Sequence, residues 1–245
     1  MTFRTGPLET QFPIIRLLRP YPTCDGAAAW RMISTKFVRS DTSCRDYNFI
    51  QILRESVDNF LQLENRQTGE ILRMRRVRDA EGQTVLTIDG SLPPRMSGPP
   101  PHVHFHQREE GMVKAGSLGA RLGNETILVS AGGTAVFPAG VVHNWWNAGD
   151  DLLELSGQAI PAGDLDRYLQ ALFAVLNASP SGRPSIFYLA HVLWRHRHTQ
   201  AVALPPKIIQ QIAFPLVLLV GRVLGKYRGT SWPGSPASCT GAPEV

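Results

Sequence analysis

The sequence predicts a mainly β protein, a barrel or sandwich of short strands that is followed by an α-helical C-terminal extension. From Leu61 to Pro161, short apolar runs end in Gly, Asn, Asp or Pro, which is typical of many short strands joined by turns. After Pro161 the apolar residues recur every three or four positions, the period of an amphipathic helix. With 245 residues and 43% hydrophobic content, the chain can form one domain with a buried core and an appendage.

The elements follow from this patterning in chain order. Residues 1–60 are poorly defined and are assigned to an N-terminal extension, and residues 61–160 to the β-barrel. The strand candidates of the barrel are, in order, ILRMRRVRDAEGQ, TVLTIDGSLPP, EEGMVKAGS, LGARLGNET, ILVSAGGT, AVFPAG, VVHNWWNAGDD and LLELSGQAIP. Residues 161–228 form the helical extension, with helices expected over 165–177, 185–198 and 206–227. Residues 229–245 are rich in Gly, Ser and Pro and predict a flexible tail.

Charge is concentrated in the C-terminal extension. The formal net charge is +5, and residues 161–228 alone hold eight basic residues against two acidic ones. The rest of the chain is nearly neutral, which argues against a nucleic-acid partner for the barrel. Within the barrel, Arg73, Arg75, Arg76 and Arg78 place positive charge on both faces of an early strand, which predicts an exposed sheet edge. A clamp for a substrate carboxylate is the alternative.

The cysteines and the N-terminus bear on the compartment. Cys24, Cys44 and Cys239 are odd in number, far apart and without a CxxC pair, so neither a disulfide framework nor a thiolate zinc knuckle explains the fold. The first residues also lack the apolar core and the cleavage site of a secretory signal. We therefore expect a cytoplasmic protein.

Four side chains form a candidate metal site. His102 and His104 are two apart in an extended run, so they point to the same face of a strand. Glu109 follows after a gap long enough for a turn, and His143 comes just after a Pro-x-Gly turn. Three imidazoles and one carboxylate suit a divalent transition metal, Fe, Mn, Ni, Cu or Zn, and spacing does not choose among them. The alternative is that the histidines are hydrogen-bonded polar groups of the core.

The same residues resemble the two motifs of the cupin superfamily. The first motif, from its first histidine onward, is matched by His102, His104, Glu109 and Gly116; its leading glycine falls at Met96, two residues before Gly98. The second motif is matched at every position, by Gly132, Pro138, Gly140, His143 and Asn147. Fifteen residues separate the motifs. The resemblance implies a small jelly-roll barrel with a metal inside, held by His102, His104, Glu109 and His143.

The resemblance supports two classes of function. One is a metal-dependent enzyme of the oxygenase or isomerase type, with hydrolysis also compatible, acting on a small organic molecule in the barrel. The other is a non-catalytic small-molecule binding or sensing module. An enzyme needs an acid or base beside the metal, and the candidates are His106 and, less directly, Glu154. His106 is also explained as a solvated turn residue.

Strand parity predicts the surroundings of the metal. Gly111 and Val113 share the face of Glu109 and are small, and Trp145 and Asn147 share the face of His143. These residues therefore predict an apolar pocket for a small-molecule ligand, although core packing explains them equally. The C-terminal helices are expected to cover the barrel or to pair in a homodimer. Peripheral contact of their basic and apolar faces with a membrane is the alternative.

Overall fold

The computed structural model describes residues 30–33, 36–39 and 60–236, in two units that divide between residues 57 and 58. In the first unit, β1 (Trp30–Ile33) pairs antiparallel with β2 (Lys36–Arg39). The remainder of the N-terminal extension expected at residues 1–60 lies outside the described residues. The second unit contains all the other described elements.

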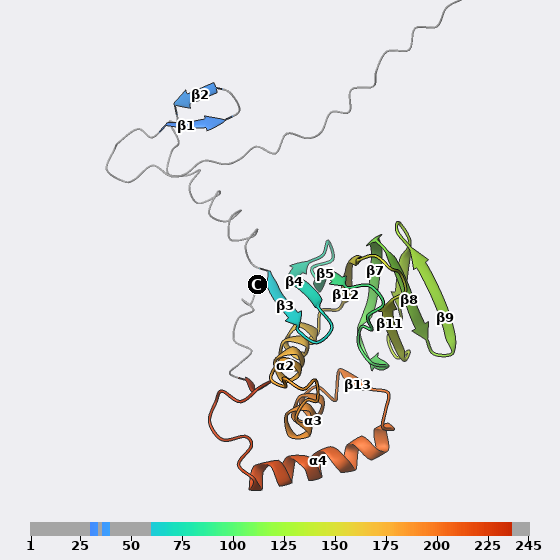
Figure 1. Ribbon diagram of the computed structural model, residues 1–245, viewed down its shortest axis with the longest axis vertical. Helices are drawn as coiled ribbons and strands as arrows, with labels where there is room; N and C mark the ends of the chain where they lie inside the picture. The colour runs from blue at the N-terminus through green and yellow to red at the C-terminus, as the bar shows by residue number, and fades with distance from the viewer. Residues whose placement is uncertain (1–29, 34–35, 40–59, 237–245) are drawn as a thin grey trace, which may run out of the picture. The chain divides into compact units, whose positions relative to one another are not determined.

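Two antiparallel sheets form the β part of the second unit (Figure 1). The larger sheet has the strand order β10-β7-β12-β5-β4-β3, and the smaller has the order β13-β6-β11-β8-β9. The strands are β3 (Leu61–Asn65), β4 (Glu70–Arg78), β5 (Thr84–Leu92), β6 (His102–His104), β7 (Arg108–Ala115), β8 (Ser117–Leu122), β9 (Glu125–Ser130), β10 (Thr134–Phe137), β11 (His143–Asn147), β12 (Leu153–Ile160) and β13 (Gln200–Val202). This is the mainly β jelly roll that the sequence predicts, with two separate sheets rather than one closed barrel.

One face of the larger sheet carries two apolar clusters. The first cluster, which includes Leu92, Val113 and Leu153, packs with Leu118 of β8 in the smaller sheet. The second cluster includes Leu72 and Leu86 and packs against the helices. Leu86 and Leu92 are an even number of residues apart on β5, so they point to the same face of the sheet. The smaller sheet and the helices therefore share the cover of that face.

Three helices follow the last strand of the larger sheet, at the places where the apolar period predicts them. They are α2 (Leu165–Asn177), α3 (Ile186–Arg195) and α4 (Lys207–Val223). Tyr168, Phe173 and Val175 of α2 lie in the second apolar cluster. Among the described residues, no helix combines the length and the apolar character needed to span a bilayer.

The expected sheet edge is found on only part of the arginine-rich strand β4. Over Glu70–Met74, which includes Arg73, the strand is paired with β3 on one side and β5 on the other, whereas its described pairing over residues 75–78 is with β5 alone. Arg76 turns inward, and its guanidinium lies 2.5 Å from the carboxylate of Asp166 on α2, which is almost fully buried. The ion pair joins the helix to the sheet, a contact that the run of arginines alone did not reveal.

The C-terminal extension also differs from a purely helical appendage. Residues 200–202 form β13, which pairs with β6 at the edge of the smaller sheet. Beyond α4, Trp232 stacks on Tyr188 of α3 with ring centroids 5.7 Å apart, and Ser235 is buried. Residues 229–236 were expected as part of a flexible tail, but they include side chains that pack on α3. The reason is that this Gly- and Pro-rich stretch contains an aromatic ring, which stacks on an aromatic ring of the helix. Residues 237–245 lie outside the described residues.

Candidate metal centre

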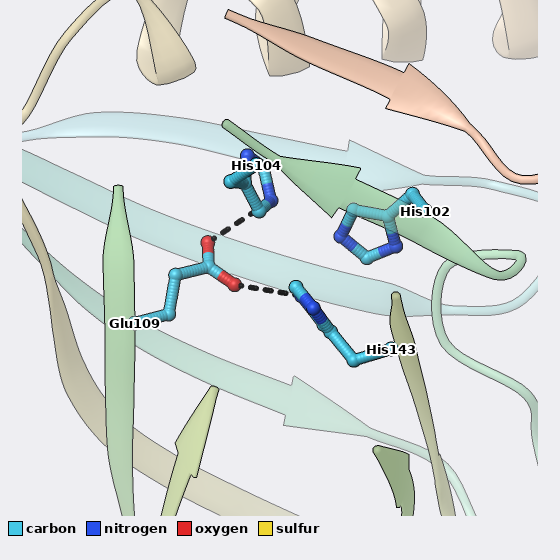
Figure 2. Close-up of side chains that lie close together, drawn as sticks. All are labelled: His102, His104, Glu109 and His143. Atoms are coloured by element: carbon cyan, nitrogen blue, oxygen red, sulfur yellow. Dashed lines mark ion pairs between the residues drawn. The ribbon is translucent and has the colours of Figure 1, made fainter. Parts of the chain in front are cut away.

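The four candidate ligands come from three strands that the fold brings together. His102 and His104 lie on β6, and His143 on β11 is the direct cross-strand partner of His102. Glu109 lies on β7, in the larger sheet. Figure 2 shows the carboxylate of Glu109 pointing toward the imidazoles, so the site bridges the two facing sheets.

The distances within this group are short enough for one ion. Each of the four side chains offers one ligand atom, and these atoms all lie within 4.8 Å of one another. The two oxygens of Glu109 lie 3.5 Å from Nε2 of His104 and 3.3 Å from Nε2 of His143 (Figure 2). His104 and His143 are buried, whereas Glu109 and His102 are partly exposed. The arrangement gives a donor set that is enclosed on one side and reachable on the other.

Backbone carbonyls fix the orientation of two of the imidazoles. Nδ1 of His102 lies 2.9 Å from the carbonyl oxygen of Pro100, and Nδ1 of His143 lies 2.9 Å from that of Val141. A carbonyl can only accept, so in each ring Nδ1 carries the hydrogen and donates it. The lone pair is then on Nε2, the atom that faces the group. This is how proteins commonly prepare a histidine to bind a metal.

The third imidazole lies opposite a residue from the C-terminal extension. His104 on β6 is the cross-strand partner of Gln200 on β13, and both side chains are buried. Burial lowers the pKa of His104 overall, while the charge of Glu109 and the nearby polar side chain of Gln200 act in the opposite direction. Gln200 was not predicted from the sequence, because a strand of three residues is too short to show a period.

Electrostatics within the site prepare the donors at neutral pH. Burial lowers the pKa of His102 to about 4, and the neighbouring imidazoles of His143 and His104 add to this effect. Burial alone would raise the pKa of Glu109, but the histidines around it, His104 first, bring it down to about 2. The site therefore presents a carboxylate beside neutral imidazoles of His102 and His104, the forms that bind a cation.

The two candidate acids or bases lie away from this group. His106 is exposed, in the bend between β6 and β7. Glu154 is exposed on β12, where its neighbours Leu153 and Leu155 face the core. Neither side chain is thus among the groups that face the four ligands.

The four predicted pocket residues occupy different environments. A side chain added at Gly111 would meet no atom within 4 Å, so there is open space beside Glu109 on the same face of β7. Val113 is fully buried in the core between the sheets, and Trp145 packs at its margin. Asn147 is buried and its amide donates to the carbonyls of Leu92 and Asp151, so it links the end of β5 to the turn before β12.

Comparison with known proteins places the site within a described domain. Residues 88–156 match the family model described as Cupin domain, and all four candidate ligands lie inside this range. No curated protein matches the chain at a significant level.

Several solved structures are similar to parts of the chain. A predicted oxalate decarboxylase from Thermotoga maritima is 21% identical, with 44% of this chain and 96% of that chain covered and a TM-score of 0.34. The Cnp3 cupin domain from Schizosaccharomyces pombe is 12% identical, with 54% and 85% covered and a TM-score of 0.32. A sugar phosphate isomerase from Silicibacter pomeroyi is 26% identical, with 36% and 58% covered and a TM-score of 0.31.

Proposed function

The chain belongs to the cupin superfamily through its domain at residues 88–156, and we propose that this domain uses a divalent transition metal to act on a small organic molecule. His102, His104 and His143 would hold the ion through Nε2, and Glu109 through its carboxylate. The separated cysteines favour a reducing compartment, the cytoplasm, for this activity.

One observation carries the proposal. Four donor atoms lie within 4.8 Å of one another, in a partly buried position where their lone pairs converge. Lone pairs that converge away from water are costly unless a cation lies between them. Imidazole nitrogens with a single carboxylate are the donors chosen by Fe, Mn, Ni, Cu or Zn, rather than by calcium or magnesium.

The residues around the site define what the protein itself contributes. A bound ion of this kind would supply a Lewis acid that holds and polarises oxygen atoms of a substrate. The carbonyls of Pro100 and Val141 keep the rings of His102 and His143 in the ligating tautomer. The open space at Gly111 would accept the substrate beside Glu109. Oxygenase or isomerase chemistry is the reaction type that we favour.

A non-catalytic binding or sensing module is the second candidate. It is favoured by the exposed positions of His106 and Glu154, because neither of these two candidates then lies beside the metal ligands as an acid or base. In such a module the metal would anchor an oxygen-bearing ligand, and no proton transfer would be needed.

Elemental analysis followed by a dioxygen-uptake screen tests the proposal. The purified full chain is expected to hold about one transition-metal ion per molecule, because the four ligands form a single donor set. Dioxygen consumption with a small organic substrate would identify an oxygenase. A redox-inert metal without uptake would point to isomerase or binding activity, whereas a chain that takes up no metal, even after reloading, would refute the site.

Replacing Gly111 with phenylalanine is expected to abolish binding of the small molecule while leaving the metal content unchanged. The added ring would fill the open space beside Glu109 without replacing a ligand. Calorimetric titration with whichever molecule the screen identifies, together with elemental analysis, measures both effects. Ligand binding that survives in this variant would show that the pocket lies elsewhere.

A further inference from the structure

Helix α4 is apolar on two opposite faces. Its inner face, with Phe214, Leu218 and Gly221, is buried or half-buried, and α4 packs beside α3 at the outside of the helical layer (Figure 1). Its outer face and C-cap hold eight large apolar residues that are 49% to 77% exposed: Ile208, Ile209, Ile212, Leu216, Leu219, Val220, Val223 and Leu224. At 3.6 residues per turn, those within the helix fall on one stripe about 120° wide.

This outer stripe is not needed for packing in the described part of the chain. The inner face already attaches the helix, since Gly221 lies against Tyr227 and the hydroxyl of Tyr227 donates to the carbonyl of Phe187 on α3. Single exposed apolar residues are ordinary, but a continuous stripe of this length marks an interaction surface.

The charge around the stripe is entirely positive. Between residues 167 and 243 the sequence contains no Asp or Glu, and Arg222, Lys226 and Arg228 are exposed at the C-terminal end of α4. Lys207 stands at the other end, with its ammonium 4.5 Å from the ring of Phe105. A partner for this surface must therefore be apolar and negatively charged.

A groove beside the stripe adds a specific feature. It lies between α3 and α4, has a volume of about 400 Å³, and is lined by His191, Trp194, Arg195, Leu218, Arg222 and Tyr227. Burial lowers the pKa of His191, and the charges of Arg195 and Arg222 lower it further. Both guanidinium groups therefore lie close to the His191 ring. Guanidinium groups bind phosphate oxygens well, and Trp and Tyr are preferred at the membrane interface.

We propose that the outer face of α4 and the groove between α3 and α4 form a docking surface for a membrane that contains anionic phospholipids. The helix would lie in the plane of the interface with its stripe among the acyl chains. Arg195 and Arg222 would hold a headgroup phosphate in the groove. This inference does not depend on the metal centre.

A second copy of the chain is a poorer partner for the same surface. In a two-fold symmetric pair each stripe would meet itself, which brings Lys207 near Arg222 when the helices run antiparallel. No acidic side chain within residues 167–243 would offset this repulsion. An anionic lipid surface offers acyl chains to the apolar stripe and negative headgroups to the basic residues beside it.

Sedimentation of the full chain with lipid vesicles tests the proposal. The protein is expected to bind phosphatidylcholine vesicles that contain about one third phosphatidylglycerol at low ionic strength, and to bind pure phosphatidylcholine far more weakly. Raising the salt should weaken binding, because the attraction between exposed charges is screened.

Two variants and two matched controls separate the parts of the surface. L216E with L219E should reduce binding at least tenfold, whereas T126E with L128E, which add the same two charges at exposed positions of β9, should reduce it far less. R195Q with R222Q should reduce binding about 25-fold, at roughly fivefold for each cation. K114Q with R121Q removes the same amount of charge from β7 and β8, away from the groove. This pair should reduce vesicle binding far less than R195Q with R222Q.

The outcomes that would overturn the proposal are distinct. Absence of binding to anionic vesicles at low salt would refute it, and so would equal losses for both pairs of charge variants, since binding would then reflect net charge alone. Sedimentation velocity without lipid gives the third outcome. If the chain does not bind vesicles and forms a dimer, and L216E with L219E converts this dimer to a monomer, the stripe is an interface between two copies of the chain.

Discussion

Replacing His143 with alanine is expected to lower the affinity for a divalent transition metal by about 100- to 1,000-fold. Apparent binding free energies for four-ligand sites are about 10–16 kcal/mol, so one ligand corresponds to roughly 2.5–4 kcal/mol. His143 is the candidate ligand whose replacement should have a large effect, because its Nε2 is buried and lies 3.3 Å from the carboxylate of Glu109. Competition with a chromophoric chelator measures the affinity.

His106 provides the matched control for this variant. It is an imidazole close in sequence to two of the candidate ligands, but it is exposed between β6 and β7. His106→Ala should leave the affinity for the metal unchanged. If the two variants lose metal equally, or if neither does, the assignment of His143 as a ligand is wrong.

The same titration measures the contribution of Gln200 to the site. Gln200→Leu should weaken metal binding by about 10- to 100-fold, because it removes the buried polar side chain that lies across the strand pair from His104. Gln200→Glu keeps an acceptor and should retain most of the affinity. An unchanged affinity in the leucine variant would show that β13 contributes backbone pairing alone.

Replacing Gly157 with alanine is expected to lower the free energy of unfolding by about 3 kcal/mol. Gly157 on β12 lies opposite Gly111 on β7, and a Cβ atom at residue 157 would lie 2.2 Å from the carbonyl oxygen of Glu110. Backbone atoms cannot rotate away, so the two strands must separate where Glu109 is held. Urea denaturation of the metal-free protein measures the loss.

Gly111 is the control for this substitution within the same cross-strand pair. A Cβ atom there meets nothing within 4 Å, so Gly111→Ala should change the stability by less than about 1 kcal/mol. Similar losses in both variants would mean that the strand pair is less tightly packed than the structure indicates. Because Glu109 adjoins the clash, Gly157→Ala should also weaken metal binding.

The local patterns of the sequence were sufficient for the fold class and for the group of candidate ligands. Period-two runs closed by turn residues predicted the strands up to β12, but no strand was predicted over Leu61–Asn65, where the structure has β3. The three- and four-residue period predicted α2, which spans Leu165–Asn177. The spacing of His102, His104, Glu109 and His143 predicted a cluster that the structure brings together.

Long-range pairing produced the features that the sequence did not predict. Gln200 reaches His104 only because β13 returns to pair with β6, nearly 100 residues away along the chain. Arg76 forms an ion pair with the buried Asp166, because α2 folds back onto β4. Neither contact leaves a local period or motif.

The sequence by itself determined most of the strands, the helices and the group of candidate ligands, because each depends on neighbours a few positions away or on fixed spacing. Only the tertiary structure decided which side chains support the ligands, where space remains beside them, and that α4 keeps an apolar face exposed. Those properties depend on which distant segments pack together, and packing is set by the whole chain at once.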